Sequence, residues 1–263
     1  MERKLQKLTI EMWRKELEPY TKDIRLVDMG DPYVWTDCSI IRVHSKGSPD
    51  FLFLEAGCGT ARTSLILARE GARVVGLDIT REACVVARRL FEYNDLGGSF
   101  VRGDILHLPF KSDVFDVVFC GGSVEHFEDT ARGLSELVRV LAKDGFFIAT
   151  VPLVSLGTLI YYQFYGNVPD LPIVRSLALL VHRKLLKGRY MIYGYEKSFT
   201  QRKIRRMFED AGLSNVQTGL YETTYTVKLF SNPFLKKIAR RLAHLRPFWP
   251  AIWVKGEKRT RRH

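Results

Sequence analysis

Apolar residues along this chain form short continuous runs, and these alternate with stretches in which apolar residues recur at the spacing of a helix. The first such run, residues 51–54, ends at Glu55 and is typical of a parallel strand covered on both faces. Residues 61–70, which follow it, have the pattern of a helix. A second strand is predicted over residues 73–78, and the next helix starts at Thr80, a favourable N-cap residue. Strands that alternate with helices in this way predict an α/β fold.

The rest of the chain adds further strands and helices. A third strand is predicted over residues 99–102, and a basic helix is predicted to begin at Thr200 and end at Gly212. The apolar stripe of that helix consists of Ile204, Met207, Phe208 and Ala211. Three more elements are expected after it: a strand at 215–220, an amphipathic helix at 234–246 and a last strand at 249–255.

A glycine turn follows the first strand. Gly57 can adopt backbone angles that a Cβ would forbid, and Gly59 lets the main chain approach a ligand closely. Dinucleotide-binding turns carry a third glycine three residues after the second, where this chain has Arg62. A pyrophosphate would also meet the carboxylate of Glu55, whereas a cationic amine or sulfonium would be stabilised there. The turn therefore favours a positively charged nucleoside over a dinucleotide.

Three successive strands end in an acidic residue. Glu55 ends the first strand, Asp78 ends the second, and Asp104 follows the third. In open α/β sheets, ligands bind at the carboxyl ends of the strands. Asp78 is suited to accept both hydroxyls of a ribose, and Asp104 to accept from an adenine amino group beside an apolar wall at Ile105. Helix capping is the alternative role for Asp78 and Asp104.

Five segments along the chain form a specific pattern when taken in order. They are Glu55-Ala-Gly-Cys-Gly-Thr, Val75-Gly-Leu-Asp, Gly103-Asp-Ile-Leu-His-Leu-Pro-Phe, Phe115-Asp-Val-Val-Phe-Cys-Gly-Gly-Ser-Val-Glu-His-Phe and Leu137-Val-Arg-Val-Leu-Ala-Lys-Asp-Gly-Phe-Phe-Ile-Ala-Thr-Val-Pro. Together they resemble a class I, seven-stranded methyltransferase that uses S-adenosylmethionine. The resemblance covers about residues 51–151 and is to the small-molecule subgroup that includes quinone methyltransferases.

The resemblance implies a fold, a cofactor and its binding residues. The expected fold is a Rossmann-like three-layer sandwich with a seven-stranded, mostly parallel sheet, whose last strand is antiparallel and inserted between strands five and six. The expected cofactor is S-adenosyl-L-methionine, and no metal is expected. The implied cofactor-binding residues are Glu55, Gly57, Cys58 and Gly59 around the methionine moiety, Asp78 at the ribose, Ile79, Asp104 and Ile105 at the adenine, and Cys120 on the methionine side.

Two positions depart from the family pattern. Ala61 stands where many relatives have another glycine, and the turn Lys143-Asp144-Gly145 replaces the usual Pro-Gly-Gly turn before the fifth strand. Both changes are tolerable, because alanine is small and Asp-Gly is itself a turn pair.

His126 is the candidate catalytic residue. It lies after the fourth strand, where the methyl group and the acceptor must meet, and could take the acceptor's proton with Glu125 or Glu128 nearby. A structural or pocket-lining role for His126 is the alternative. Cys120 is expected to be a small core residue rather than a nucleophile, because the four cysteines are scattered and form no Cys-x-x-Cys pair.

The chain divides into four predicted parts. Residues 1–48 form a helical extension with Leu5, Leu8, Met12, Trp13 and Leu17, which turns polar towards a breaker at 47–49. Tyr33 and Trp35 in this extension either line a pocket or pack on the core. Residues 49–152 form the cofactor-binding core, residues 153–197 a substrate-side cap with aromatic residues at 161–165, and residues 198–263 complete the core.

Charge and composition limit the partners. The formal net charge is +12, concentrated in the carboxyl-terminal half, which suits an anionic membrane surface, nucleic acid or an acidic substrate. A solvated basic face is the alternative. The charged first residues do not resemble a signal peptide, and no apolar run approaches the ~20 residues that span a bilayer. We expect a cytoplasmic protein, either soluble or peripheral on the inner membrane face.

The expected activity is methyl transfer to a small-molecule acceptor of apolar or lipid-like character, leaving S-adenosylhomocysteine. An RNA or DNA methyltransferase is the first alternative, favoured by the charge but opposed by the absence of an Asn-Pro-Pro-Tyr-like motif where Cys120-Gly-Gly-Ser stands. A non-catalytic cofactor-binding scaffold or assembly factor is the second. The sequence does not indicate the oligomeric state.

Overall fold

The computed structural model describes residues 2–45, 50–127, 129–156, 167–169, 196–221 and 232–259. Within these ranges seven strands form one sheet in the order β3-β2-β1-β4-β5-β9-β8. Their bounds are β1 (Leu52–Ala56), β2 (Arg73–Asp78), β3 (Ser99–Arg102), β4 (Phe115–Gly121), β5 (Leu141–Pro152), β8 (Ser214–Leu220) and β9 (Ala251–Glu257).

The sheet confirms the predicted fold class. β1 pairs in parallel with β2 and β4, and β4 pairs in parallel with β5. β9 is antiparallel to both of its neighbours, β5 and β8, and lies between them as expected. The last strand starts at Ala251, two residues later than predicted, because Arg246–Phe248 form a short 3-10 helix before it.

Seven helices accompany the sheet in the described ranges: α1 (Glu2–Lys22), α2 (Pro32–His44), α3 (Arg62–Arg69), α4 (Arg81–Tyr93), α5 (Thr130–Val140), α7 (Gln201–Asp210) and α8 (Pro233–Ala243). The predicted N-caps are confirmed, because the Thr80 hydroxyl accepts from the Ala83 amide and the Thr200 hydroxyl from the Lys203 amide. Gly212, with a φ of +100°, follows the end of α7 as predicted.

Alternating side chains of the strands sort the core into two layers. Phe53, Val117 and Phe119 pack on one face of the sheet with residues of α2, α3 and α4. Leu54 and Val118 pack on the other face with residues of α5 and α7. This alternation follows from the two-residue period of a strand, and both faces are apolar because helices cover both.

The sheet changes direction between β1 and β4. From β1 the chain moves outward to β2 and β3, then returns and continues through β4 and β5 on the other side. The carboxyl ends of β1 and β4 therefore flank a topological switch point, the place where ligands of open α/β sheets bind.

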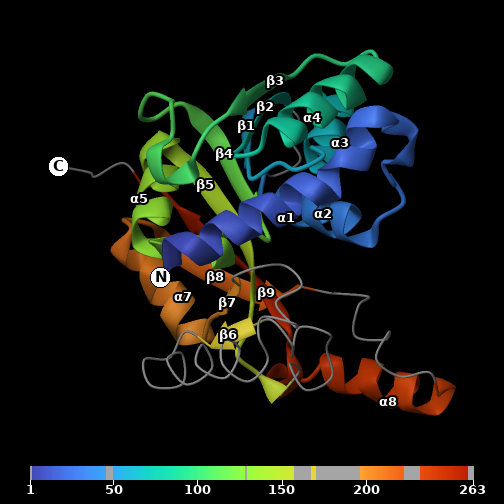
Figure 1. Ribbon diagram of the computed structural model, residues 1–263. Helices are drawn as coiled ribbons and strands as arrows, with labels where there is room; N and C mark the ends of the chain where they lie inside the picture. The colour runs from blue at the N-terminus through green and yellow to red at the C-terminus, as the bar shows by residue number, and fades with distance from the viewer. Residues whose placement is uncertain are drawn as a thin grey trace.

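The amino-terminal extension contains one helix more than the sequence suggested. The predicted polar stretch after the first helix instead forms α2, which begins at the N-cap Asp31 with Pro32 in its first turn. Its buried face includes Val34, Cys38 and Ile41, whose spacing is helical. In Figure 1, α1, drawn in blue, crosses the view in front of β4 and β5, and Arg14 on α1 makes an ion pair with Glu82 on α4.

Most of the predicted cap lies outside the described residues, including the aromatic run at 161–165, and so does the breaker at 47–49. The described part of the cap includes β6 (Asn167–Pro169), which pairs in parallel with β7 (Glu196–Ser198) as a separate two-stranded sheet. The four-part division of the chain stays a prediction. Among the described helices, none is both long enough and apolar enough to cross a bilayer.

Candidate functional site

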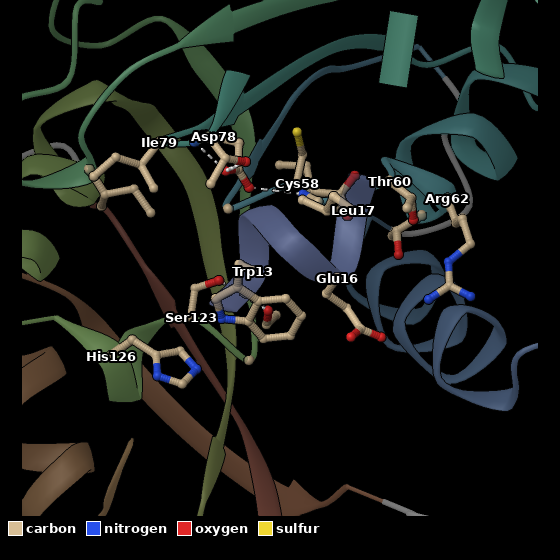
Figure 2. A pocket seen from close by; sticks show the side chains of 18 of the residues that line it. Trp13, Glu16, Leu17, Cys58, Thr60, Arg62, Asp78, Ile79, Ser123 and His126 are labelled. Carbon is tan, nitrogen blue, oxygen red and sulfur yellow. Dashed lines mark hydrogen bonds between the residues drawn. The ribbon is translucent and has the colours of Figure 1, made fainter. Parts of the chain in front are cut away.

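A cavity of about 570 Å³ opens over the switch point. Its floor is made by residues at or just after the carboxyl ends of β1 to β4, and its cover by side chains of α1 and α2 (Figure 2). Of the predicted site residues, the cavity brings together Glu55, Gly57, Cys58, Gly59, Asp78, Ile79, Asp104, Ile105 and His126.

The turn after β1 requires glycine at position 57. Gly57 has a φ of +79°, and a Cβ there would lie 2.3 Å from the Ser123 hydroxyl oxygen. The amides of Gly57 and Cys58 both donate to the Leu77 carbonyl, at 2.7 and 3.0 Å. These two bonds fasten the turn to the end of β2, so the first two strand ends are held side by side.

Ala61, one of the two departures from the family pattern, takes a left-handed conformation with a φ of +56°. This conformation favours glycine and costs an L-residue about 1–2 kcal/mol. The position is also the N-cap of α3 and offers no side-chain hydrogen bond to the helix. The turn therefore keeps the geometry expected of a glycine even though alanine occupies it.

Glu55 is buried, with 7% of its surface exposed, and lines the cavity. One carboxylate oxygen, Oε2, accepts from the Ser64 amide at 3.0 Å and the Ser64 hydroxyl at 2.5 Å. Burial raises the pKa of Glu55 to about 7; the charge of Asp78 adds to this rise, while the Ser64 donors and Arg62 oppose it. A cation in the cavity would favour the ionised form.

Asp78 fastens the turn to the next helix while facing the cavity. Its Oδ1 accepts from the amide and the hydroxyl of Thr80, both at 2.8 Å, and its Oδ2 accepts from the Gly59 amide at 3.1 Å. Burial raises the pKa of Asp78, against the lowering effect of the Thr80 and Gly59 donors. The carboxylate therefore has a structural role as well as a place on the cavity wall.

Asp104 likewise both caps a helix and borders the cavity. It caps the short helix Ile105–His107 by accepting from the Leu106 amide at 2.9 Å, which is the alternative that the sequence left open. Its side chain is 41% exposed and borders the cavity beside Ile105.

Cys120 lies in the core rather than on the cavity wall. It is fully buried among apolar residues such as Val118 and Ala149, and it is not among the cavity-lining residues. Because side chains alternate along β4, Cys120 points to the α5 face, and the next residue, Gly121, borders the cavity instead. Burial raises the pKa of the Cys120 thiol well above its usual value, so the thiol is neutral.

His126 and the amino-terminal helix meet at the far end of the cavity. The rings of His126 and Trp13 are 6.3 Å apart and nearly perpendicular, and Ser123 lines the same cavity (Figure 2). Of the two extension residues considered from the sequence, Tyr33 lines the cavity, whereas Trp35 is half exposed and does not. Glu128 lies outside the described residues.

Five charged residues line the cavity that the sequence did not indicate as site residues: Glu16, Asp28, Asp31, Asp37 and Arg62. Arg62 binds the extension to α3, through an ion pair with Asp31 at 3.0 Å and a hydrogen bond to the Asp28 carbonyl at 2.7 Å. Asp37 on α2 is a buried acid on the cavity wall. The spacing of Val34, Cys38 and Ile41 was the signal that could have placed Asp37 on the buried face of a helix.

The sheet order, the antiparallel β9 and the acidic strand ends around one cavity are those of class I methyltransferases. Residues 54–149 match the family described as a methyltransferase domain. The demethylmenaquinone methyltransferase of Lactiplantibacillus plantarum is 26% identical over 214 residues, which are 75% of this chain and 84% of that relative.

Two solved structures share the fold. The YcgJ protein of Bacillus subtilis has a TM-score of 0.57 and 19% identity, covering 85% of this chain and 98% of its own. Magnesium protoporphyrin IX methyltransferase from Synechocystis PCC 6803, solved with bound S-adenosylhomocysteine, has a TM-score of 0.56 and 20% identity, covering 87% of this chain and 83% of its own. The matching methyltransferase domain, the relatives and the shared fold together support an S-adenosylmethionine-dependent methyltransferase with the class I fold.

The cavity fits this cofactor chemically. S-Adenosylmethionine is an extended nucleoside with a sulfonium and an ammonium group, and the cavity wall carries Glu55, Asp78 and Asp104 along its length. Of these three, Glu55 is buried, and a buried carboxylate is costly without a positive partner, so a cationic ligand relieves a cost that the free protein bears.

The raised pKa of Glu55 predicts that cofactor affinity depends on pH. Below pH 7 Glu55 is largely protonated, and binding a cation must release that proton, so the Kd for S-adenosylmethionine should fall by up to about tenfold per pH unit as pH rises towards 7. Isothermal titration calorimetry between pH 6 and 8 measures this directly. In Glu55→Gln, the increase in cofactor affinity centred near pH 7 should disappear. An unchanged dependence of Kd on pH in that variant would show that Glu55 does not cause this increase.

Proposed function

We propose that this protein methylates a small, apolar, lipid-like acceptor, and that demethylated naphthoquinols of the menaquinone type are its acceptor class. The observation that carries the proposal is the apolar and aromatic part of the cavity wall: Trp13 packs on His126, and Ile10, Leu106 and Phe127 line the same cavity. A planar apolar ring fits such a wall, whereas a charged acceptor would lose its hydration there. The demethylmenaquinone methyltransferases among the relatives support the same acceptor class.

The cofactor roles proposed for the strand ends follow from their chemistry. Asp78 accepts the ribose hydroxyls, Asp104 accepts the adenine amino group, and Ile79 and Ile105 cover the faces of the adenine. Glu55 and the turn at Gly57, Cys58 and Gly59 surround the methionine moiety, with its cationic groups near the Glu55 carboxylate.

The reaction depends mainly on positioning. When bound, S-adenosylmethionine supplies a methyl group already activated by its sulfonium. The chain has to hold the acceptor atom in line behind that methyl and to keep water away. Trp13 and Leu17 on α1 cover the cavity, and Ser123 and His126 border it on the β4 side.

We assign His126 the role of general base. As the new bond to the methyl group forms, the acceptor loses one proton, and the imidazole of His126 takes it. Trp13, packed edge-on at 6.3 Å, limits where that ring and the acceptor ring can lie.

A lipid-like acceptor also gives a role to α8. Figure 1 shows α8 projecting away from the sheet, and Phe234, Leu235 and Ile238 on it are exposed, Phe234 by 70%. Lys237 and Arg241 lie exposed on the same helix. An amphipathic helix with exposed apolar residues and basic neighbours suits the surface of an anionic bilayer, from which a lipid acceptor would be taken.

Nucleic acid is the competing acceptor. The net charge of +12 favours it, while the apolar part of the cavity wall and the segment Cys120-Gly-Gly-Ser at the end of β4 oppose it. A cofactor-binding scaffold without activity is the other alternative. The intact acids at the strand ends argue against a loss of cofactor binding, and only a measurement of methyl transfer separates such a scaffold from an enzyme.

The acceptor class can be tested with S-adenosylmethionine carrying a tritiated methyl group. The protein is supplied with a demethylated naphthoquinol in anionic vesicles, the same quinol in neutral vesicles, or total RNA. We expect label in the organic extract, with faster transfer from anionic than from neutral vesicles because of the basic residues near α8. Label retained in RNA, or no label in any acceptor, would contradict the proposal.

The base role of His126 makes a separate prediction. His126→Ala should lower kcat by about 100-fold or more while the Kd for S-adenosylmethionine stays unchanged, because general-base catalysis contributes on the order of 10²–10⁴-fold. His244→Ala is the matched control, since His244 is exposed after α8 and is not among the residues lining the cavity. A His126→Ala enzyme with undiminished kcat would remove the proposed base.

A further inference from the structure

Asp37 is a buried acid that the amino-terminal extension brings to the cavity wall. Only 8% of its surface is exposed, and it lines the cavity that contains Glu55 and Gly121. A Cβ added to Gly121 would lie 3.7 Å from Asp37 Oδ2, so this oxygen faces the carboxyl end of β4. The other oxygen, Oδ1, accepts a hydrogen bond from the Tyr221 hydroxyl at 2.8 Å.

Two segments distant in the sequence, α2 and the end of β8, meet at this carboxyl group. Tyr221 follows the end of β8 and is itself buried. The ring of Tyr33 stacks on the ring of Tyr221 with centroids 5.8 Å apart. Tyr33 and Asp37 are four residues apart on α2, so one helix face contacts both the ring and the hydroxyl of Tyr221.

Burying this acid is costly. Burial raises the pKa of Asp37 to about 8; the Tyr221 and Thr63 side chains donate to it and oppose the rise, while the charges of Glu55 and Asp31 add to it. A residue needed only for packing between α2 and the sheet would be apolar. The carboxyl group therefore points to a ligand with a positive charge.

The strand order indicates which end of the cofactor Asp37 meets. Asp104 and Asp78 stand after β3 and at the end of β2, at the side of the cavity assigned to adenine and ribose. Asp37 stands beside Glu55 and Gly121, over β1 and β4, on the other side of Asp78. In an extended S-adenosylmethionine molecule, that end is the amino acid.

We propose that Asp37 is a further cofactor-binding residue, which accepts a hydrogen bond from the α-ammonium group of the methionine moiety. This inference rests on the cofactor placement proposed above. Tyr221 is a positioning residue: its hydroxyl orients the Asp37 carboxylate and favours the ionised form that an ammonium group requires.

Three ligands separate this role from its alternatives. S-Adenosylmethionine has the ammonium and the sulfonium, S-adenosylhomocysteine has the ammonium only, and 5′-methylthioadenosine has neither. Calorimetry at pH 8 should show that Asp37→Asn weakens binding of the first two by about tenfold or more, as expected for a charge-assisted hydrogen bond, and leaves 5′-methylthioadenosine unchanged. Asp104→Asn is the matched control, because an adenine contact should affect all three ligands alike.

Unchanged binding of S-adenosylhomocysteine to Asp37→Asn would overturn the inference. If only the binding of S-adenosylmethionine were weakened, Asp37 would contact the sulfonium rather than the ammonium, which also contradicts the inference. Equal loss of all three ligands would also overturn it. Failure of the wild-type protein to bind any of them would instead refute the cofactor placement on which the inference rests.

If Asp37→Asn does not fold, the variant Tyr221→Phe tests the role of Asp37 instead. Removing the hydroxyl should raise the pKa of Asp37, so the pH at which S-adenosylhomocysteine affinity levels off should move upward while 5′-methylthioadenosine binding stays the same. An unmoved pH profile would contradict the role of both residues.

Discussion

The attachment of the glycine turn to the end of β2 is the constraint on which the site depends. The Leu77 carbonyl accepts from two amides of the turn, and the next residue, Asp78, accepts from the Gly59 amide. These bonds bring the ends of β1 and β2 together and point Asp78 at the cavity. They also require Gly57, because a Cβ there would collide with Ser123 at the end of β4.

The electrostatic consequence is a cavity rich in buried carboxyl groups. Glu55, Asp78 and Asp37 come from three different elements, and burial raises the pKa of each. Donors within the protein offset part of this cost but leave the groups facing the cavity. A positively charged nucleoside offsets the rest, which links the architecture of the turn to the choice of S-adenosylmethionine.

The sequence predicted the strands and helix caps around the glycine turn well because their signals are local. Short apolar runs ending in Glu55 and Asp78 indicate buried strands whose ends meet, and helix caps such as Thr80 depend on a few neighbouring residues. The cofactor roles of these residues stay predictions.

Features that depend on contacts between distant segments could not be predicted in the same way. α2 was missed because its helical face is narrow and interrupted by polar residues, and the importance of Asp37 follows from Tyr221, 184 positions away. Cys120 was assigned to the cavity although the alternation along β4 turns it into the core. The acceptor depends on side chains that α1 brings over the strand ends, such as Trp13 beside His126.

The central claim is that the acids at the strand ends form the S-adenosylmethionine site, and Asp78 tests it most directly. Calorimetry should detect binding to the wild-type protein and a Kd at least about tenfold higher for Asp78→Asn, because a buried charged hydrogen-bond acceptor is lost. Asp95→Asn, the same change in an exposed turn, should bind like the wild type. Absence of binding by the wild type, or equal affinities for wild type and Asp78→Asn, would contradict the account.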